Sequence, residues 1–171
     1  IIVSSLRALQ LFLRKNARLN RLPDYVIIEG PLAGGHLGFG MDWAQYDLHA
    51  IVAEIAQYLK AEGLNIPLIA AGGINSFEDI ARLQAMGASA VQLGTAFAVT
   101  EESDAHAEFK RVLAEARPED MVEFTSVAGL PARAVATPWL RAYLKIEPRL
   151  QAVAHVKARC TKSFDCLAQC G

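Results

Sequence analysis

Hydrophobic residues along this chain gather in four short runs, which alternate with longer stretches of helical spacing. The runs lie at residues 1–3, 25–28, 67–71 and 90–93. The second run, Tyr-Val-Ile-Ile, has no polar alternation, which is typical of a strand covered on both faces. Between the runs, apolar residues recur every three or four positions, as on the buried face of a helix. The pattern predicts four βα units that build a parallel sheet.

The expected helices begin at recognisable capping residues. Ser4 and Ser5 are alternative caps for the helix after the first strand. The helix after the third strand has two alternative capping-box pairs, Asn75 with Glu78 and Ser76 with Asp79. Its predicted buried face consists of Phe77, Ile80, Leu83 and Met86.

Four βα units are half of the set that closes a barrel, and an open parallel sheet would expose its edges. A flavodoxin-like open sheet is the structural alternative, since it also alternates strands and helices. Glycines after two consecutive strands favour the barrel, because barrels often bind phosphate with the loops after their last two strands. We therefore expect an α/β fold of the (β/α)8 TIM-barrel class, with an earlier part of the polypeptide missing before Ile1.

Three regions are expected along the chain. Residues 1–117 would form the C-terminal half of the barrel, and a mixed segment at 118–150 would pack over the barrel mouth. Residues 151–171 form a polar tail that contains Cys160, Cys166 and Cys170. The gaps between these cysteines match no standard metal-site spacing closely, so free thiols and ligands completed by other residues both stay open. No metal site is expected in the barrel.

Glycine-containing pairs directly follow the third and fourth strands. These pairs are Gly72-Gly73 and Gly94-Thr95. A bound phosphate needs close approach to the backbone, which glycine permits, and it gains from a nearby helix N-terminus. The alternative is that each glycine only supplies the positive φ of a tight turn. Two such pairs on adjacent strands favour a phosphate site.

A glycine-rich loop at residues 31–43 follows the second strand and carries His36. A single loop histidine is usually just solvated, but this one is expected on the same face of the barrel as the phosphate glycines. We therefore take His36 as the candidate catalytic residue. The other histidines lie in helical or tail segments and are predicted to be surface residues: His49, His106 and His155.

Composition narrows the class of partner. The 17 basic and 18 acidic residues give a formal net charge of -1, which offers no field to gather nucleic acid or an anionic membrane. No apolar run reaches the roughly 20 residues of a membrane span. These features predict a small-molecule partner and a cytoplasmic location.

Three ordered segments of the chain resemble the signatures of the nitronate monooxygenase family, formerly called 2-nitropropane dioxygenases. They are EGPLAGGH at 29–36, AAGGI at 70–74 and QLGTAF at 92–97. The resemblance covers roughly residues 1–140 and includes Ser126 with the segment 129–133. It implies an FMN-binding (β/α)8 barrel of which this chain supplies strands five to eight.

The resemblance also implies roles for individual residues. His36 matches the catalytic histidine, as an acid/base or an anion-binding group. The residues implied to bind FMN are Gly72, Gly73, Gly94 and Thr95 at the phosphate, Gly34 and Gln92 along the ribityl chain and ring, and Glu29 close to the flavin. Two positions depart from the pattern. Leu32 stands where many members carry glutamate, and Glu29 stands where an amide is common.

Three functions are candidates for this chain. The first is FMN-dependent oxidation of alkyl nitronates or nitroalkanes by O2, with the other half of the barrel as a partner and a homodimer left open. The second is NAD(P)H-dependent flavin reduction of the enoyl-acyl-carrier-protein reductase type, which the Glu29-Gly30 pair resembles. The third is a flavin-binding module without turnover.

Overall fold

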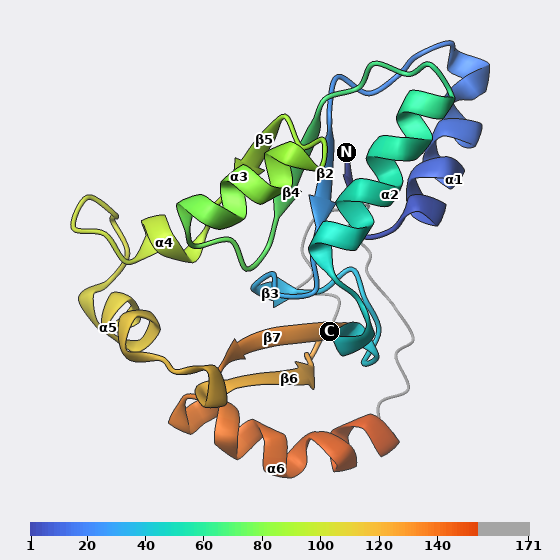
Figure 1. Cartoon of the computed structure of the whole chain (residues 1–171). Coiled ribbons are helices and arrows are strands. Elements are labelled where there is room, and N and C mark those ends of the chain that lie inside the picture. The colour runs from blue at the N-terminus through green and yellow to red at the C-terminus, as the bar shows by residue number, and fades with distance from the viewer. Residues whose placement is uncertain (154–171) are drawn as a thin grey trace. The chain divides into compact units, whose positions relative to one another are not determined.

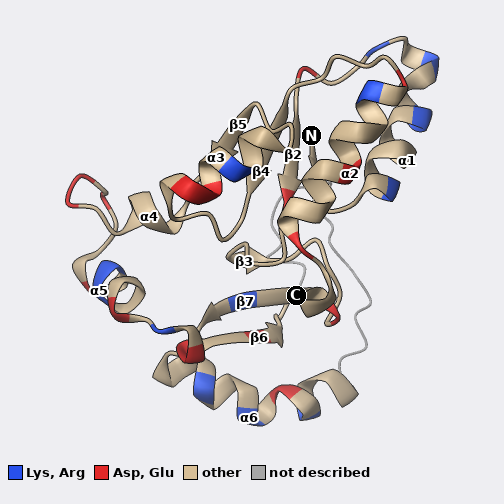
Figure 2. Ribbon diagram, in the orientation of Figure 1, with Lys and Arg blue, Asp and Glu red and all other residues tan. Residues whose placement is uncertain are grey.

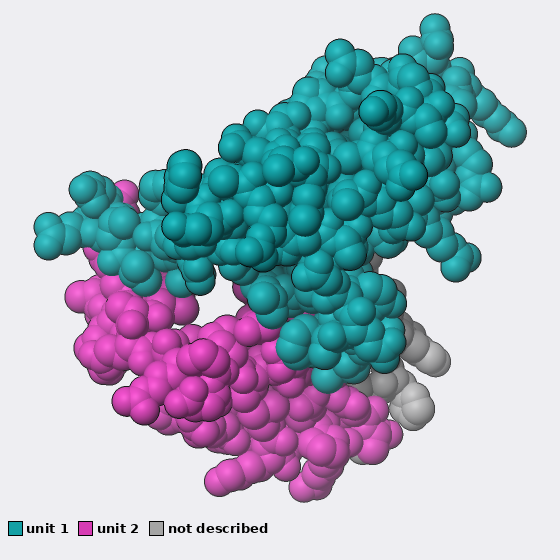
Figure 3. Space-filling view, viewed as in Figure 1, with its two compact units in different colours: residues 1–33, 38–103 teal, residues 34–37, 104–171 magenta. Residues whose placement is uncertain are grey.

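The computed structural model describes residues 1–153. Its contacts divide the chain into two compact units, coloured separately in Figure 3. Unit 1 consists of Ile1–Ala33 and Gly38–Ser103, and unit 2 consists of Gly34–Leu37 and the chain from Asp104 onward. The expected boundaries after residues 117 and 150 stay a prediction. The three cysteines and His155 lie outside the described residues.

A four-stranded parallel sheet forms the centre of unit 1 (Figure 1). Its strands are β1 (Ile2–Val3), β2 (Val26–Glu29), β4 (Leu68–Ala71) and β5 (Ala90–Gln92). They lie in the order β1-β2-β4-β5, so each of these four strands pairs with the next of the four along the chain. A flavodoxin-like sheet would reverse this order at a switch point. The sequential order is that of a barrel wall, and it confirms the predicted βα units.

Each strand of unit 1 is followed by a helix. The helices are α1 (Leu6–Asn16), α2 (Leu48–Ala61), α3 (Phe77–Ala85) and α4 (Thr95–Ala98), with short 3-10 turns η1 (Ala17–Leu19) and η2 (Trp43–Gln45). Ser5 rather than Ser4 caps α1, since its Oγ accepts from the Ala8 amide at 3.3 Å. Ser76 caps α3, since its Oγ accepts from the Asp79 amide at 3.1 Å. A hydrogen bond from the Ser76 side chain to the Asp79 carboxyl lowers the pKa of that carboxyl. Figure 2 shows that α1 carries basic but no acidic residues.

The core of unit 1 lies between the sheet and its helices. Val26, Ile28 and Leu68 from the sheet pack in one cluster with Val52 and Ile55 of α2. Fully burying a side chain of this size contributes about 1.5–3 kcal/mol. Leu9 of α1 and Leu83 of α3 belong to the same cluster, so three helices pack on this face of the sheet.

The opposite face of the sheet is less covered. Ile2, Ile27, Ile69 and Ala90 are aligned in register across the four strands. Ile2 is 64% exposed and Ala90 is also exposed, whereas the two central isoleucines are half-buried. In a closed barrel this face points inward.

The predicted buried face of α3 is partly wrong. Leu83 is fully buried and Ile80 is half-buried, but Phe77 is 78% exposed. Three-residue steps fall short of a full helical turn by about 60° each, because an α-helix has about 3.6 residues per turn. Two such steps carry Phe77 away from the side on which Leu83 lies.

Unit 2 contains a three-stranded antiparallel sheet in the order β3-β7-β6. Its elements are β3 (Gly35–His36), α5 (Ala107–Glu115), η3 (Pro118–Asp120), β6 (Met121–Thr125), β7 (Pro131–Val135) and α6 (Pro138–Val153). Tyr143 on α6 is 8% exposed, and its hydroxyl donates to the Thr125 carbonyl at 2.7 Å. Burial, followed by the Glu147 charge, raises the pKa of Tyr143.

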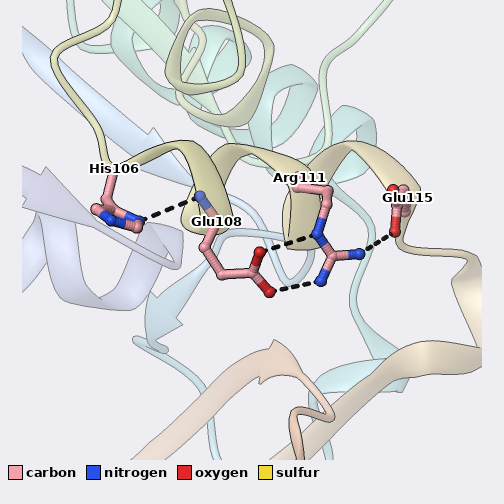
Figure 4. Close-up of polar contacts among 4 residues, drawn as sticks. All are labelled: His106, Glu108, Arg111 and Glu115. Atoms are coloured by element: carbon pink, nitrogen blue, oxygen red, sulfur yellow. Dashed lines mark hydrogen bonds and ion pairs between the residues drawn. The ribbon is translucent and has the colours of Figure 1, made fainter.

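Helix α5 has a chain of polar contacts on its surface (Figure 4). His106 caps the helix, because its Nδ1 accepts from the Glu108 amide at 3.1 Å. Arg111 donates to both carboxylate oxygens of Glu108 and to Glu115. The bonds from Arg111 lower the pKa of Glu108 and raise the pKa of the guanidinium. His106 is exposed, as predicted.

Within residues 1–153, none of the helices has the length and apolar character needed to cross a membrane.

Candidate functional site

The carboxyl ends of β2, β4 and β5 form one edge of the parallel sheet. Glu29 is in register with Ala71, which is in register with Gln92. Because β4 and β5 are parallel and adjacent, the glycine turns that follow them leave the sheet at the same edge. The structure thus brings Gly72-Gly73 and Gly94-Thr95 to neighbouring strand ends, which is the condition for both turns to contact one phosphate.

The turn after β4 needs its glycines for reasons internal to the chain. Gly72 and Gly73 have φ of +103° and +75°. A Cβ on Gly72 would lie 2.9 Å from the backbone nitrogen of Ala33, and one on Gly73 would lie 2.7 Å from the Leu32 Cβ. The turn interpretation therefore accounts for both residues. Their backbone is available to a ligand as well, but their presence alone does not require one.

The turn after β5 differs in this respect. Gly94 has φ of -107° and ψ of -74°, and a Cβ there would meet no atom within 4 Å. It is the N-terminal cap of α4 and has no capping side chain, which Ser or Asp would supply at that position. Neither packing nor positive φ explains this glycine. A ligand that approaches the backbone closely would explain it.

Glu29 ends β2 and contacts the glycine-rich loop. Its Oε2 accepts a hydrogen bond from the Gly38 amide at 2.8 Å. The carbonyl of Gly38 accepts another from the Ser4 Oγ at 2.7 Å. No local sequence pattern predicts these two contacts, because the three residues lie in three separate segments. Gln92, the other predicted ligand on this row, is exposed.

His36 lies in unit 2 on strand β3, inside the segment expected to be a loop. Its backbone is in register with Ala132 of β7, and the next residue, Leu37, donates to the Pro131 carbonyl at 2.8 Å. The imidazole Nε2 is 2.9 Å from the Oγ of Ser126; His36 is exposed and Ser126 is half-buried. Gly34, just before β3, has open space where a Cβ would lie. Ser126 thus joins the candidate site as the hydrogen-bond partner of His36.

His49 is not the surface residue that was predicted. Its side chain is 26% exposed, and Nδ1 lies 3.7 Å from the Asp47 carboxylate. Its Nε2 is buried and has no hydrogen-bond partner among the described residues. Position 49 is the second residue of α2, where the first turn of the helix packs beside buried Leu48. Helical spacing alone did not separate this half-buried position from an exposed one.

A cavity of about 240 Å³ in unit 1 lies against the Gly72-Gly73 turn. It is lined by residues of the β2 loop, η2 and the starts of α2 and α3, including Leu32, Trp43, His49 and Asp79. In the described part of the chain, no three His, Cys, Asp or Glu side chains are grouped so as to hold a metal ion.

Comparison with known proteins decides the family. The family model described as nitronate monooxygenase matches residues 1–164. The chain belongs to the nitronate monooxygenase family. It is 33% identical over 117 residues to a probable nitronate monooxygenase of Bacillus subtilis, a match that covers 68% of this chain and 33% of that protein. It is 34% identical over 110 residues to the nitronate monooxygenase of Pseudomonas aeruginosa, covering 64% and 31%.

Two solved structures show the same partial relationship. FabK from Thermotoga maritima matches with a TM-score of 0.68 and 32% identity, covering 88% of this chain and 43% of that one. The nitroalkane oxidase of Streptomyces ansochromogenes matches with a TM-score of 0.61 and 32% identity, covering 86% and 40%. The chain also spans about a third of the length of the curated relatives. Its fold is the α/β fold of a TIM barrel, of which it forms four βα units.

Proposed function

We propose that this chain carries the phosphate-binding half of an FMN-dependent oxidoreductase that oxidises alkyl nitronates or nitroalkanes with O2. The observation that carries the proposal is the pair of glycine turns at neighbouring ends of β4 and β5, one of which has no internal reason to be glycine. Family membership supports the chemistry. The other half of the barrel would cover the exposed sheet face, and we assign the protein to the cytoplasm.

The residues at the strand edge fit a flavin phosphate. Backbone at Gly72, Gly73, Gly94 and Thr95 would hold the phosphate, since a small residue at each turn allows close approach. Glu29, Gln92 and Gly34 would lie along the ribityl chain and ring. When bound, FMN accepts electrons from the substrate and passes them to O2.

His36 is the proposed catalytic residue. A neutral imidazole would take the α-proton of a nitroalkane, and a protonated one would bind the nitronate anion, so both roles stay open. The hydroxyl of Ser126, 2.9 Å from Nε2, would orient the ring and select its tautomer.

The test is a set of variants in the complete protein. We expect His36→Ala to lower kcat by about 100-fold or more, the range of general acid-base catalysis. Ser126→Ala should lower it less, because the imidazole remains. Flavin absorbance should show full FMN content in both, and His106→Ala, a change at the exposed histidine that caps α5, should leave turnover unchanged. Unaltered turnover in His36→Ala would remove this residue from the mechanism.

A second candidate function is NAD(P)H-dependent reduction of an enoyl thioester or quinone. The match to FabK at a TM-score of 0.68 favours it, together with the Glu29-Gly30 pair. Anaerobic mixing with NAD(P)H separates the two functions: rapid bleaching of the flavin without a nitro compound would support the reductase. A protein that binds FMN but turns over neither class of substrate would instead be a binding module.

A further inference from the structure

The backbone of Gly38 is held from two sides by side chains at neighbouring strand ends. The Ser4 Oγ donates to its carbonyl oxygen at 2.7 Å, and the Glu29 Oε2 accepts from its amide at 2.8 Å. We call these three residues the Gly38 clamp. Both polar groups of one backbone residue are used, so the clamp fixes the position and the direction of the chain at this point.

The two side chains of the clamp come from adjacent strands at one level. Val3 of β1 is in register with Ile28 of β2, so Ser4 and Glu29 follow at the same height. The hydroxyl and the carboxylate therefore stand next to each other at the edge where the sheet ends. A hydrogen bond to a carboxylate is stronger than one between neutral groups.

A side chain at position 38 would displace these two groups. A Cβ at position 38 would lie 2.8 Å from the Glu29 Oε2 and 2.9 Å from the Ser4 Oγ. Gly34, at the other end of the same loop, would meet nothing within 4 Å. The loop is therefore held by hydrogen bonds at Gly38. The next residue, Phe39, is 8% exposed and packs in the core of unit 1.

The clamp restricts the position of His36 through the short stretch of backbone that connects His36 to Gly38. His36 is two residues before Gly38, and two residues span at most about 7 Å. A fixed Gly38 therefore limits where the segment that carries the imidazole can lie. We propose that Ser4 and Glu29 are positioning residues for His36, acting through the Gly38 backbone. The inference rests on the proposed role of His36, and it leaves Oε1 of Glu29 for any contact with FMN.

The experiment compares two neighbouring serines in the complete protein. Ser4→Ala removes one bond of the clamp, and Ser4→Thr keeps the hydroxyl. Ser5→Ala is the matched control, since it removes only the cap of α1. Hydrogen exchange is followed by mass spectrometry on peptides that cover residues 34–40, with and without FMN, and kcat and KM are measured with a nitronate.

We expect Ser4→Ala to raise amide exchange in these peptides and to lower kcat about tenfold, as loss of one ordinary hydrogen bond can do. The KM and the FMN content should change little. Ser4→Thr should bring amide exchange and kcat most of the way back to the values of the parent protein. Ser5→Ala should lower the unfolding midpoint without changing loop exchange or kcat. Glu29→Ala should raise exchange as Ser4→Ala does, whereas Glu29→Gln keeps an acceptor oxygen and should raise it less.

Wild-type exchange in Ser4→Ala, or raised exchange with wild-type kcat, would overturn the inference. The proposed function fails separately, by the absence of FMN binding or nitronate turnover in the unaltered protein. If the unaltered protein lacks these activities but Ser4→Ala still raises amide exchange in residues 34–40, the clamp anchors the loop and has no role through His36.

Discussion

The two units position the atoms of the candidate functional site by different means. In unit 1 these atoms are mostly backbone groups, fixed by a strand, a tight turn and a helix that follow one another along the chain. In unit 2 the candidate is one side chain, His36, held by β7 and Ser126, which lie about ninety residues away. Local geometry builds the first region and long-range pairing builds the second. The two should therefore respond to different substitutions.

Gly72→Ala is expected to have the largest effect on the stability of unit 1. Its φ of +103° and a Cβ 2.9 Å from the Ala33 backbone nitrogen make the change costly, about 1–3 kcal/mol in the free energy of unfolding. Gly34→Ala is the control for stability, with no positive φ and no close atom, and should change it by less than about 0.5 kcal/mol. Denaturant unfolding measures both. Equal midpoints for the two variants would contradict the account of this turn.

A sharper distinction within unit 1 comes from Gly94→Ala. We expect stability within about 1 kcal/mol of the parent protein, because the added Cβ meets no atom within 4 Å. The Kd for FMN should rise at least about tenfold, which is a loss of about 1.4 kcal/mol. Flavin fluorescence titration measures it. Gly94→Ser, which supplies a better helix cap, should weaken FMN binding equally; unchanged affinity in both variants would remove Gly94 from the phosphate site.

The smallest expected effect concerns unit 2 at alkaline pH. Burial and Glu147 raise the pKa of Tyr143 above its ordinary value of 10.0. A raised folded-state pKa gives stability that is complete below pH 10 and is lost as pH rises through the folded value. Tyr143→Phe should cost about 0.5–1.5 kcal/mol at neutral pH, by loss of the bond to the Thr125 carbonyl, and should reduce the alkaline loss.

Unfolding midpoints between about pH 8 and about pH 11 test this prediction. The same alkaline decline in Tyr143→Phe and in the parent protein would show that another group causes it.

Much of unit 1 could be predicted because each βα unit is determined by residues that are close together in the sequence. Apolar runs marked its strands, and two alternative capping-box pairs marked the start of α3, of which Ser76 with Asp79 is the one that forms. The glycine turns were also visible, since a strand followed directly by glycine needs no distant information. Phe77 was misplaced because a three-residue period drifts around the helix instead of following one side.

Unit 2 and the loop contacts could not be predicted in the same way. Strand β3 is two residues long and has no alternation to reveal it. Its existence depends on β7, and the bond between His36 and Ser126 joins residues 90 positions apart. The bond from Gly38 to Glu29 depends likewise on how the loop returns to the sheet. Neither contact has a signal in the residues next to it.

The segment Gly34–Leu37 also decides how the protein can be divided. The chain leaves unit 1 after Ala33, returns at Gly38 and leaves again after Ser103. A single protease cut between Ser103 and Asp104 would leave β3 on the first fragment and deprive β7 of its neighbour on the second. Neither fragment would inherit a whole unit, so the boundary between the units is a poor place for dissection or for swapping halves with a relative.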